Sequence, residues 1–274
     1  MTVPTITLNN GLRMPQLGFG VWQVPDDAVT DAVLEALAVG YRSIDTAASY
    51  GNETGVGKAL RRSGLERDEV YVSTKVANPD HGYDRTLRAF DASSERLGTD
   101  VVDLYLVHWP LPGNDRYVST WKAMERLYAE GRARSIGVCN FQRPHLERVL
   151  AEGGIAPMVN QIELHPLLGQ AELRAFHAEH NIVTEAWSPL GSGRLLEHPL
   201  IVEIAREHER TTAQILLRWH IQLGNMVIPK SVTPVRIRSN FEVFDFELSG
   251  EEMGRIGALD EGRRFGPDPD DLEE

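Results

Sequence analysis

Short apolar runs alternate with longer amphipathic stretches along most of this chain, and this alternation constrains the fold more than any other feature. Eight runs have the composition of buried strands: residues 17–22, a run that ends at Asp45, and residues 70–76, 101–109, 134–140, 158–164, 182–190 and 226–231. Between them, apolar residues recur at helical spacing over residues 26–39, 84–97, 117–130 and 213–223. Regular alternation of strand and helix predicts a parallel sheet with helical crossovers.

Eight such units, with no linker rich in Pro, Gly or Ser between them, favour one closed (β/α)8 barrel domain over residues 1–274. The alternative, a doubly wound dinucleotide fold, would carry G-x-G-x-x-G after its first strand, and the sequence has no such sextet. Asn9-Asn10-Gly11, between two short strand-like segments, predicts an N-terminal β-hairpin. The polar tail over residues 262–274 is expected to be mobile.

The charge and cysteine content limit the partners and the compartment. A net charge of −12 opposes loose binding to nucleic acid or anionic membranes, although a local basic pocket could still hold an anion. Cys139 is the only cysteine, so no intrachain disulfide can form, which agrees with a reducing compartment. The sequence has neither a signal-peptide pattern nor an apolar run of about 18 residues. We therefore expect a cytoplasmic protein.

Three ionisable residues of different kinds follow successive strands. Asp45, Lys75 and His108 end the second, third and fourth strands, and Tyr50 lies in the loop after Asp45. Strand ends of a barrel converge on one mouth, so we expect these four groups to meet there. A phenol with a pKa of about 10 is a poor acid unless its anion is stabilised, and a nearby ammonium does that. The set therefore predicts protonation of a carbonyl oxygen while another reagent attacks its carbon.

Other interpretations of the same residues stay open. Asp45 and Lys75 could be an ordinary buried ion pair, and Tyr50 a packing residue with a wet hydroxyl. Trp22 and Trp109 could form the aromatic wall of a substrate pocket or belong to the core. For the histidines outside this set, His145, His165 and His177 among them, we expect surface or structural roles. The sequence contains no metal motif such as H-E-x-x-H and no G-x-S-x-G elbow.

The segment over residues 228–241 predicts an anion site. Its strand ends in Lys230-Ser231, and a helix is expected to begin near Thr233-Pro234, with Pro at its first position. Basic residues, hydroxyls and a helix N-terminus together suit a phosphate, and barrels commonly bind phosphates after strands seven and eight. Arg236 and Arg238 add positive charge, although they could instead form a solvated basic helix face.

Three long segments of the sequence resemble signatures of the aldo-keto reductase family. They are GYRSIDTAASYGNETGVG at 40–57, RSIGVCNF at 134–141 and IPKSVTPVRIRSN at 228–240. With LVHWP and NQIELHP between them, the resemblance covers nearly the whole chain, and it is strongest to bacterial 2,5-diketo-D-gluconate reductases. It implies a (β/α)8 barrel that uses NADPH to reduce aldehydes or ketones, with dicarbonyls and keto-sugars among the candidate substrates. It also implies a monomer.

The resemblance assigns roles residue by residue. Tyr50 would be the acid, Lys75 would lower its pKa, Asp45 would pair with Lys75, and His108 would orient the carbonyl. Residues implied to hold the nicotinamide or the pyrophosphate are Cys139, Asn140, Gln161, Trp187, Ser188, Leu190, Gly191 and Ser192. Those implied to hold the 2′-phosphate and adenine are Lys230, Ser231, Val232, Thr233, Arg236 and Asn240.

The sequence departs from the family pattern at three places: Cys139 stands where Ser is common, Ser239 where Glu is common, and Ala77-Asn78 replaces a bulkier pair. None of these is one of the four predicted catalytic positions. Two rival functions remain: an aldolase that forms a Schiff base on Lys75, and a protein that binds NADPH without catalysis.

Overall fold

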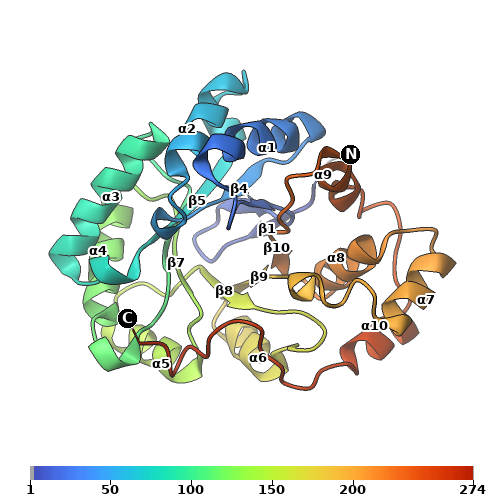
Figure 1. The fold of residues 1–274 in the computed structure, drawn as a ribbon. Coiled ribbons are helices and arrows are strands. Elements are labelled where there is room, and N and C mark those ends of the chain that lie inside the picture. Colours follow the sequence, from blue (N-terminus) through green and yellow to red (C-terminus); the bar gives the residue numbers. More distant parts are fainter. Residues whose placement is uncertain (1–2, 274) are drawn as a thin grey trace.

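The computed structural model describes residues 3–273, and its centre is an eight-stranded parallel sheet (Figure 1). The strands follow one another around the sheet in chain order, from β3 to β10. Their bounds are β3 Phe19–Gly20, β4 Ser43–Asp45, β5 Tyr71–Val76, β6 Leu104–Val107, β7 Ile136–Cys139, β8 Val159–Glu163, β9 Val183–Trp187 and β10 Met226–Val227.

The sheet closes on itself between its first and last strands. Gly18 N donates to Val227 O at 2.8 Å, and Gly20 N donates to the carbonyl oxygen of Pro229 at 3.1 Å. Gly20 is required for this approach, because a Cβ there would lie 2.8 Å from the carbonyl oxygen of Ile228. The fold is therefore the predicted (β/α)8 barrel.

Helices surround the barrel and bury their apolar faces against it (Figure 1). Their bounds are α1 Asp26–Val39, α2 Glu53–Arg62, α3 Tyr83–Leu97, α4 Tyr117–Ala129, α5 Arg143–Glu152, α6 Ala171–Glu179, α7 Pro199–Glu207, α8 Thr212–Gln222, α9 Pro234–Phe241 and α10 Gly250–Gly257. The large side chains between strands and helices, such as Trp121 and Phe90, are fully buried. This shell of apolar contacts supplies most of the driving force for folding.

The sequence patterns predicted the long elements correctly. The hairpin is present as β1 Thr5–Thr7 and β2 Arg13–Pro15, joined through Asn9-Asn10-Gly11. Helix α8 covers nearly all of the predicted stretch over residues 213–223, and it begins after Thr211, whose hydroxyl accepts from Gln214 N. Helices α5, α6, α7 and α10 were not singled out, and they have 10, 9, 9 and 8 residues. Such lengths are shorter than the window in which helical periodicity can be recognised.

The expectation of a mobile tail is wrong for the part of it that the structure describes. In Figure 1 the red C-terminal segment leaves α10, crosses α6 and ends beside α5. The side-chain amide of Gln142 donates to Asp268 at 3.1 Å and to Asp270 at 2.9 Å, and Asp270 also lies 3.3 Å from His145 Nε2. We call residues 263–272 the C-terminal strap. Its acidic residues reach donors on α5 and the residue before it.

Candidate active site

Three neighbouring strands carry the ionisable residues to one end of the barrel. Asp45 is the last residue of β4, Lys75 the penultimate residue of β5, and His108 follows the last residue of β6. β5 lies between β4 and β6 in the sheet, in parallel register with both. Because carboxyl ends of parallel strands meet at one mouth, the three side chains share one site.

The loop after β4 brings Tyr50 to the same place. Tyr50 ends a single 3₁₀ turn, Ala48–Tyr50, and its backbone N–H donates to the carbonyl oxygen of Ala47. Asn52 holds the loop, because its side-chain amide donates to the carbonyl oxygens of Val21 and Val24 at 2.9 and 2.8 Å. The loop is thus attached to the end of the neighbouring strand β3, so the tyrosine is supported from two strands.

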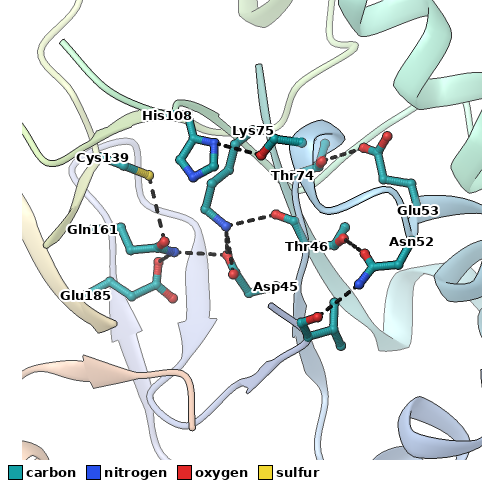
Figure 2. A network of polar contacts seen from close by, with 12 residues as sticks. Asp45, Thr46, Asn52, Glu53, Thr74, Lys75, His108, Cys139, Gln161 and Glu185 are labelled. Atoms are coloured by element: carbon teal, nitrogen blue, oxygen red, sulfur yellow. Dashed lines mark hydrogen bonds and ion pairs between the residues drawn. The ribbon is translucent and has the colours of Figure 1, made fainter. Parts of the chain in front are cut away.

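A fully buried ion pair lies beneath this loop (Figure 2). Lys75 Nζ donates to both carboxylate oxygens of Asp45, at 2.8 and 2.7 Å, and to the carbonyl oxygen of Thr46 at 2.8 Å. Burial alone would lower the pKa of the Lys75 ammonium, but the Asp45 carboxylate holds it well above its ordinary value. Lys75 is therefore a permanent cation, and its three hydrogens all have acceptors.

Lys75 also lies against the ring of Tyr50. Its Nζ is 4.9 Å from the centroid of the phenol ring. Burial raises the pKa of Tyr50 to about 12, and the Lys75 ammonium acts in the opposite direction by stabilising the phenolate. At neutral pH the phenol holds its proton, next to the one cation that favours its release.

His108 completes the group as a neutral imidazole. Burial, together with the positive charge of Lys75, lowers the pKa of His108 to about 3. Its Nδ1 lies 3.2 Å from the hydroxyl of Ser49, and its ring is 5.8 Å from the ring of Tyr50, centroid to centroid. A neutral imidazole has one N–H to donate, so it can hydrogen-bond the oxygen that the phenol would protonate. The structure thus brings the four predicted side chains together, and their roles stay predictions.

Gln161 on β8 and Cys139 on β7 lie next to the Asp45–Lys75 ion pair. Gln161 Nε2 donates to Asp45 Oδ1 and to Glu185 Oε2, both at 2.9 Å, and its oxygen faces Cys139 Sγ at 3.8 Å (Figure 2). Burial raises the pKa of the Cys139 thiol well above its ordinary value, so the thiol stays protonated. Glu185 was not among the predicted site residues. Its signal in the sequence is an acidic residue inside an apolar strand run, where an exposed charge has no place.

Asn140 and Trp187, both predicted to contact a nicotinamide, are hydrogen-bonded to each other. Trp187 Nε1 donates to Asn140 Oδ1 at 2.7 Å, and Asn140 Nδ2 donates to the carbonyl oxygen of His108 at 3.1 Å. Asn140 has a left-handed backbone with φ of 62°, which turns its side chain back toward β6. One amide hydrogen and one acceptor position of Asn140 are left for a ligand.

The predicted anion site lies at the end of β10 and the start of α9. Lys230 and Arg236 are exposed, and within residues 3–273 neither takes part in an ion pair. Helix α9 begins at Pro234 as predicted, and its N-cap Thr233 makes no side-chain capping bond, so its first N–H groups are open to a ligand. Arg238, by contrast, forms an ion pair with Glu35 of α1 at 2.9 Å, so its charge is already balanced within the protein.

The predicted pyrophosphate residues form the turn after β9. Ser188, Gly191 and Ser192 all have positive φ, and the hydroxyls of Ser188 and Ser192 lie 3.4 Å apart. Ser192 is exposed and Leu190 is half-buried. At the far end of the predicted cofactor set, Asn240 is buried in α9, while Val232 is exposed.

The remaining predicted residues differ in burial: Trp22 is exposed, whereas three of the other histidines are buried. Trp22 is 51% exposed beside the mouth, so it is not a core residue, and Trp109 stacks near His108 at 6.5 Å between centroids. A surface role is wrong for His145, His165 and His177, because all three are buried. His177, for example, hydrogen-bonds Asn160 and Thr184 at 2.9 and 2.8 Å, which fits the structural role that was the other expectation.

A second buried carboxylate, Glu163, ties the C-terminal strap to the mouth. It accepts from the backbone N–H of Phe265 at 2.7 Å and of Gly266 at 3.1 Å. Gly266 lies against Trp187, since a Cβ on Gly266 would be 2.5 Å from the edge of the indole. These contacts were missed from the sequence. As with Glu185, the available signal is an acidic residue within a buried strand.

A closed barrel with a buried group of ionisable side chains at its mouth is typical of a barrel enzyme. A sequence model described as the Aldo/keto reductase family matches residues 14–261. An aldo-keto reductase of Mycolicibacterium smegmatis is 58% identical over 266 residues, with 97% of both chains covered. The methylglyoxal reductase DkgA of Escherichia coli is 51% identical over 273 residues, with 98% of both covered. The chain belongs to the aldo/keto reductase family and is an oxidoreductase of that class.

Solved structures agree with this assignment. A crystal structure of an aldo/keto reductase from Brucella melitensis superposes with a TM-score of 0.92 at 56% identity and covers 94% of this chain and 100% of that one. A variant of Gox0644 solved in complex with NADPH gives a TM-score of 0.96 at 47% identity, with both chains fully covered. In the part of the chain that the structure describes, no helix is long and apolar enough to cross a membrane.

Proposed function

We propose that this protein reduces small aldehydes and ketones, dicarbonyls among them, to alcohols with NADPH, and that Tyr50 donates the proton. The observation that carries the proposal is the buried Asp45–Lys75 pair directly against the Tyr50 ring. An ammonium fixed by three hydrogen bonds cannot move away as the phenol ionises. Its charge is therefore already in place where negative charge develops, which is the most effective form of electrostatic catalysis.

Each residue of the group has a distinct part in the proposed reaction. NADPH supplies a hydride when it is bound, and the protein supplies the proton and the orientation of the carbonyl. His108, held neutral, donates a hydrogen bond to the carbonyl oxygen and positions it. Tyr50 transfers its proton to that oxygen, and Lys75 stabilises the phenolate that remains. Asp45 keeps Lys75 charged and in place.

The chemistry of the surrounding residues fits this cofactor. Asn140 has a donor and an acceptor to spare for a carboxamide, and the indole of Trp187 stands beside it. At the other end of the mouth, Lys230, Arg236 and the open N-terminus of α9 suit the 2′-phosphate that distinguishes NADPH from NADH. The NADPH bound to the Gox0644 variant supports the same cofactor for this chain.

The substrate class follows from the relatives and the mouth. Two proteins named methylglyoxal reductase DkgA, from Escherichia coli and Yersinia pestis, are 51% and 53% identical to this chain. Methylglyoxal is a small dicarbonyl, and the exposed Trp22 and the Trp109 that stacks near His108 could supply the apolar surface that a small-molecule site needs. We infer methylglyoxal as the first substrate to assay, with 2,5-diketo-D-gluconate as the second. The monomeric state, the single domain and the cytoplasmic location stay predictions.

The aldolase alternative conflicts with the hydrogen bonding of Lys75. A lysine that attacks a carbonyl must be neutral and have a free lone pair. All three hydrogens of the Lys75 ammonium are donated, two of them to a carboxylate that favours the charged form. Reduction with borohydride in the presence of a carbonyl substrate should therefore leave Lys75 unmodified.

Tyr50→Phe tests the proposal, because it removes one hydroxyl and keeps the ring that packs on Lys75. We expect the rate of methylglyoxal reduction to fall by about 10²–10⁴-fold. NADPH binding, followed by quenching of tryptophan fluorescence, should persist in the variant. Turnover equal to that of the wild type would show that Tyr50 is not the acid. Absence of NADPH binding in the wild type itself would refute the cofactor assignment.

A further inference from the structure

Glu185 is a buried carboxyl group beside the proposed catalytic residues, and the proposed mechanism gives it no role. It lies in the middle of β9, is 1% exposed, and points into the barrel toward Gln161 (Figure 2). Its Oε2 accepts from Gln161 Nε2 at 2.9 Å, while Oε1 has no hydrogen-bond partner within residues 3–273. A buried carboxylate oxygen without a donor is costly, so an acidic residue at this place requires an explanation.

The two hydrogens of the Gln161 amide go to two different carboxyl groups. One is donated to Asp45 Oδ1 and the other to Glu185 Oε2. If the amide were turned over, its oxygen would face Asp45, a carboxylate that cannot donate. The two carboxyl groups thus set the orientation of Gln161 and turn its oxygen toward Cys139, the last residue of β7.

The local charge favours a proton on Glu185. The titratable groups that face it are Asp45 from β4, Tyr71 and Lys75 from β5, and Cys139 from β7. Burial keeps the tyrosine and the thiol neutral, so among the groups that face Glu185 within residues 3–273 the one cation is Lys75, and it is already paired with Asp45. Burial, and then the charge of Asp45, raises the pKa of Glu185 to about 8.

We propose that Glu185 is a positioning residue of the nicotinamide site, which acts through Gln161 and holds a proton while the cofactor is bound. This inference rests on the proposed function, because Gln161 is taken to meet the carboxamide of NADPH. With its amide hydrogens committed inward, Gln161 presents only an acceptor to the mouth. It therefore binds the amino group of the carboxamide and not its oxygen. This choice fixes the orientation of the nicotinamide ring.

Loss of the proton would place a second negative charge beside Asp45. Gln161 would then lie between two carboxylates, with one ammonium to balance both. The added charge would also favour the protonated form of Tyr50 and so oppose the release of its proton. NADPH affinity and turnover should therefore both decline as pH rises through the range in which Glu185 ionises.

Two substitutions separate hydrogen bonding from charge. Glu185→Leu removes the acceptor at similar volume, and we expect NADPH affinity, measured by fluorescence titration at pH 7, to fall about tenfold. Glu185→Gln keeps an acceptor and mimics the protonated acid, so it should recover most of this loss and abolish the decline in affinity between pH 7 and pH 9. Glu95→Gln, an exposed carboxyl on α3, is the matched control.

Unfolding of the cofactor-free protein gives an independent measurement. A glutamic acid that keeps its proton up to pH 8 when folded, but loses it near pH 4.3 when unfolded, makes the folded state less stable as pH rises between these values. Glu185→Gln should therefore gain stability relative to the wild type between pH 5.5 and pH 8.5 in urea titrations. The Glu95→Gln control should not.

The outcomes are distinct. Wild-type affinity and an unchanged pH profile in Glu185→Leu would overturn the positioning role. A loss of NADPH affinity in Glu185→Gln as large as in Glu185→Leu would show that Glu185 is not protonated. A difference in stability between Glu185→Gln and the wild type that did not change with pH would show the same. If the wild type failed to bind NADPH or to reduce carbonyls, the proposed function would fail instead, and the unfolding measurement would still report on the protonation of Glu185.

Discussion

The inner and outer halves of the candidate site differ in how completely their polar groups are paired. Around Asp45 and Lys75, every charged atom has a partner inside the barrel. Around Lys230 and Arg236, the charges are exposed, and within residues 3–273 they take part in no ion pair. The inner region thus consists of buried, paired charges, and the outer region of exposed charges available to a ligand.

The difference follows from what each region has to do. Groups that stabilise a developing charge are most effective when they are already oriented, because reorientation during the reaction costs free energy. Groups that capture an anionic ligand must be open to it, and those that already hold a protein carboxylate would have to exchange partners. Inner residues should therefore govern the chemical step and stability, and outer residues affinity and choice of cofactor.

The largest expected effect is in the inner region. Lys75→Met removes the ammonium that pairs with Asp45 and leaves that carboxylate buried without its cation. We expect stability to fall by about 3–5 kcal/mol in urea unfolding, and turnover by at least about 10²-fold. Lys122→Met, at an exposed position on α4, is the control and should change neither. Wild-type stability in Lys75→Met would show that the buried pair does not hold the inner network in place.

An intermediate effect is expected in the outer region. Arg236→Ala removes an exposed guanidinium that the fold does not use, so stability should be retained. Loss of one charged hydrogen bond, worth about 1.5–3 kcal/mol, should weaken NADPH binding by roughly 10–100-fold while NADH binding stays the same. Arg88→Ala, exposed on α3, serves as the control. Equal weakening for NADPH and NADH would contradict a 2′-phosphate site.

The smallest effect tests the border between the two regions. In Gly266→Ala, the new Cβ would meet the indole of Trp187 at 2.5 Å, so either the C-terminal strap or the indole must shift. We expect NADPH affinity and substrate KM to change by a few fold, with little effect on unfolding, because the strap lies outside the apolar core. Gly254→Ala on α10 is the matched control, since nothing lies within 4 Å of its Cβ. Equal binding in both variants would show that the strap does not shape the mouth.

The inner site could be predicted from the sequence because strand ends are local features. Asp45, Lys75 and His108 each stand at the end of an apolar run. In a barrel the carboxyl ends of the strands converge on one mouth, so residues at these ends are brought together. The partners of Glu163 and Glu185 could not be predicted in the same way. Glu163 bonds Phe265, 102 residues further along the chain, and no local pattern indicates such a pairing. The tail seemed mobile because its residues are polar, and its actual partners lie on distant elements.

The C-terminal strap is synthesised after all the barrel strands, so its contacts with the mouth form late. Chains fold from the N-terminus as they emerge from the ribosome, so every barrel strand is available before Phe265 and Gly266 exist. Glu163 acquires its two backbone donors only after residues 265 and 266 have been synthesised, 102 and 103 residues after Glu163 itself. A product that stops after α10 would contain every strand and helix that the structure describes and would still lack the segment that contacts Glu163 and Trp187. An assay of such a product, or of one with a fusion at the C-terminus, would report on an incomplete site.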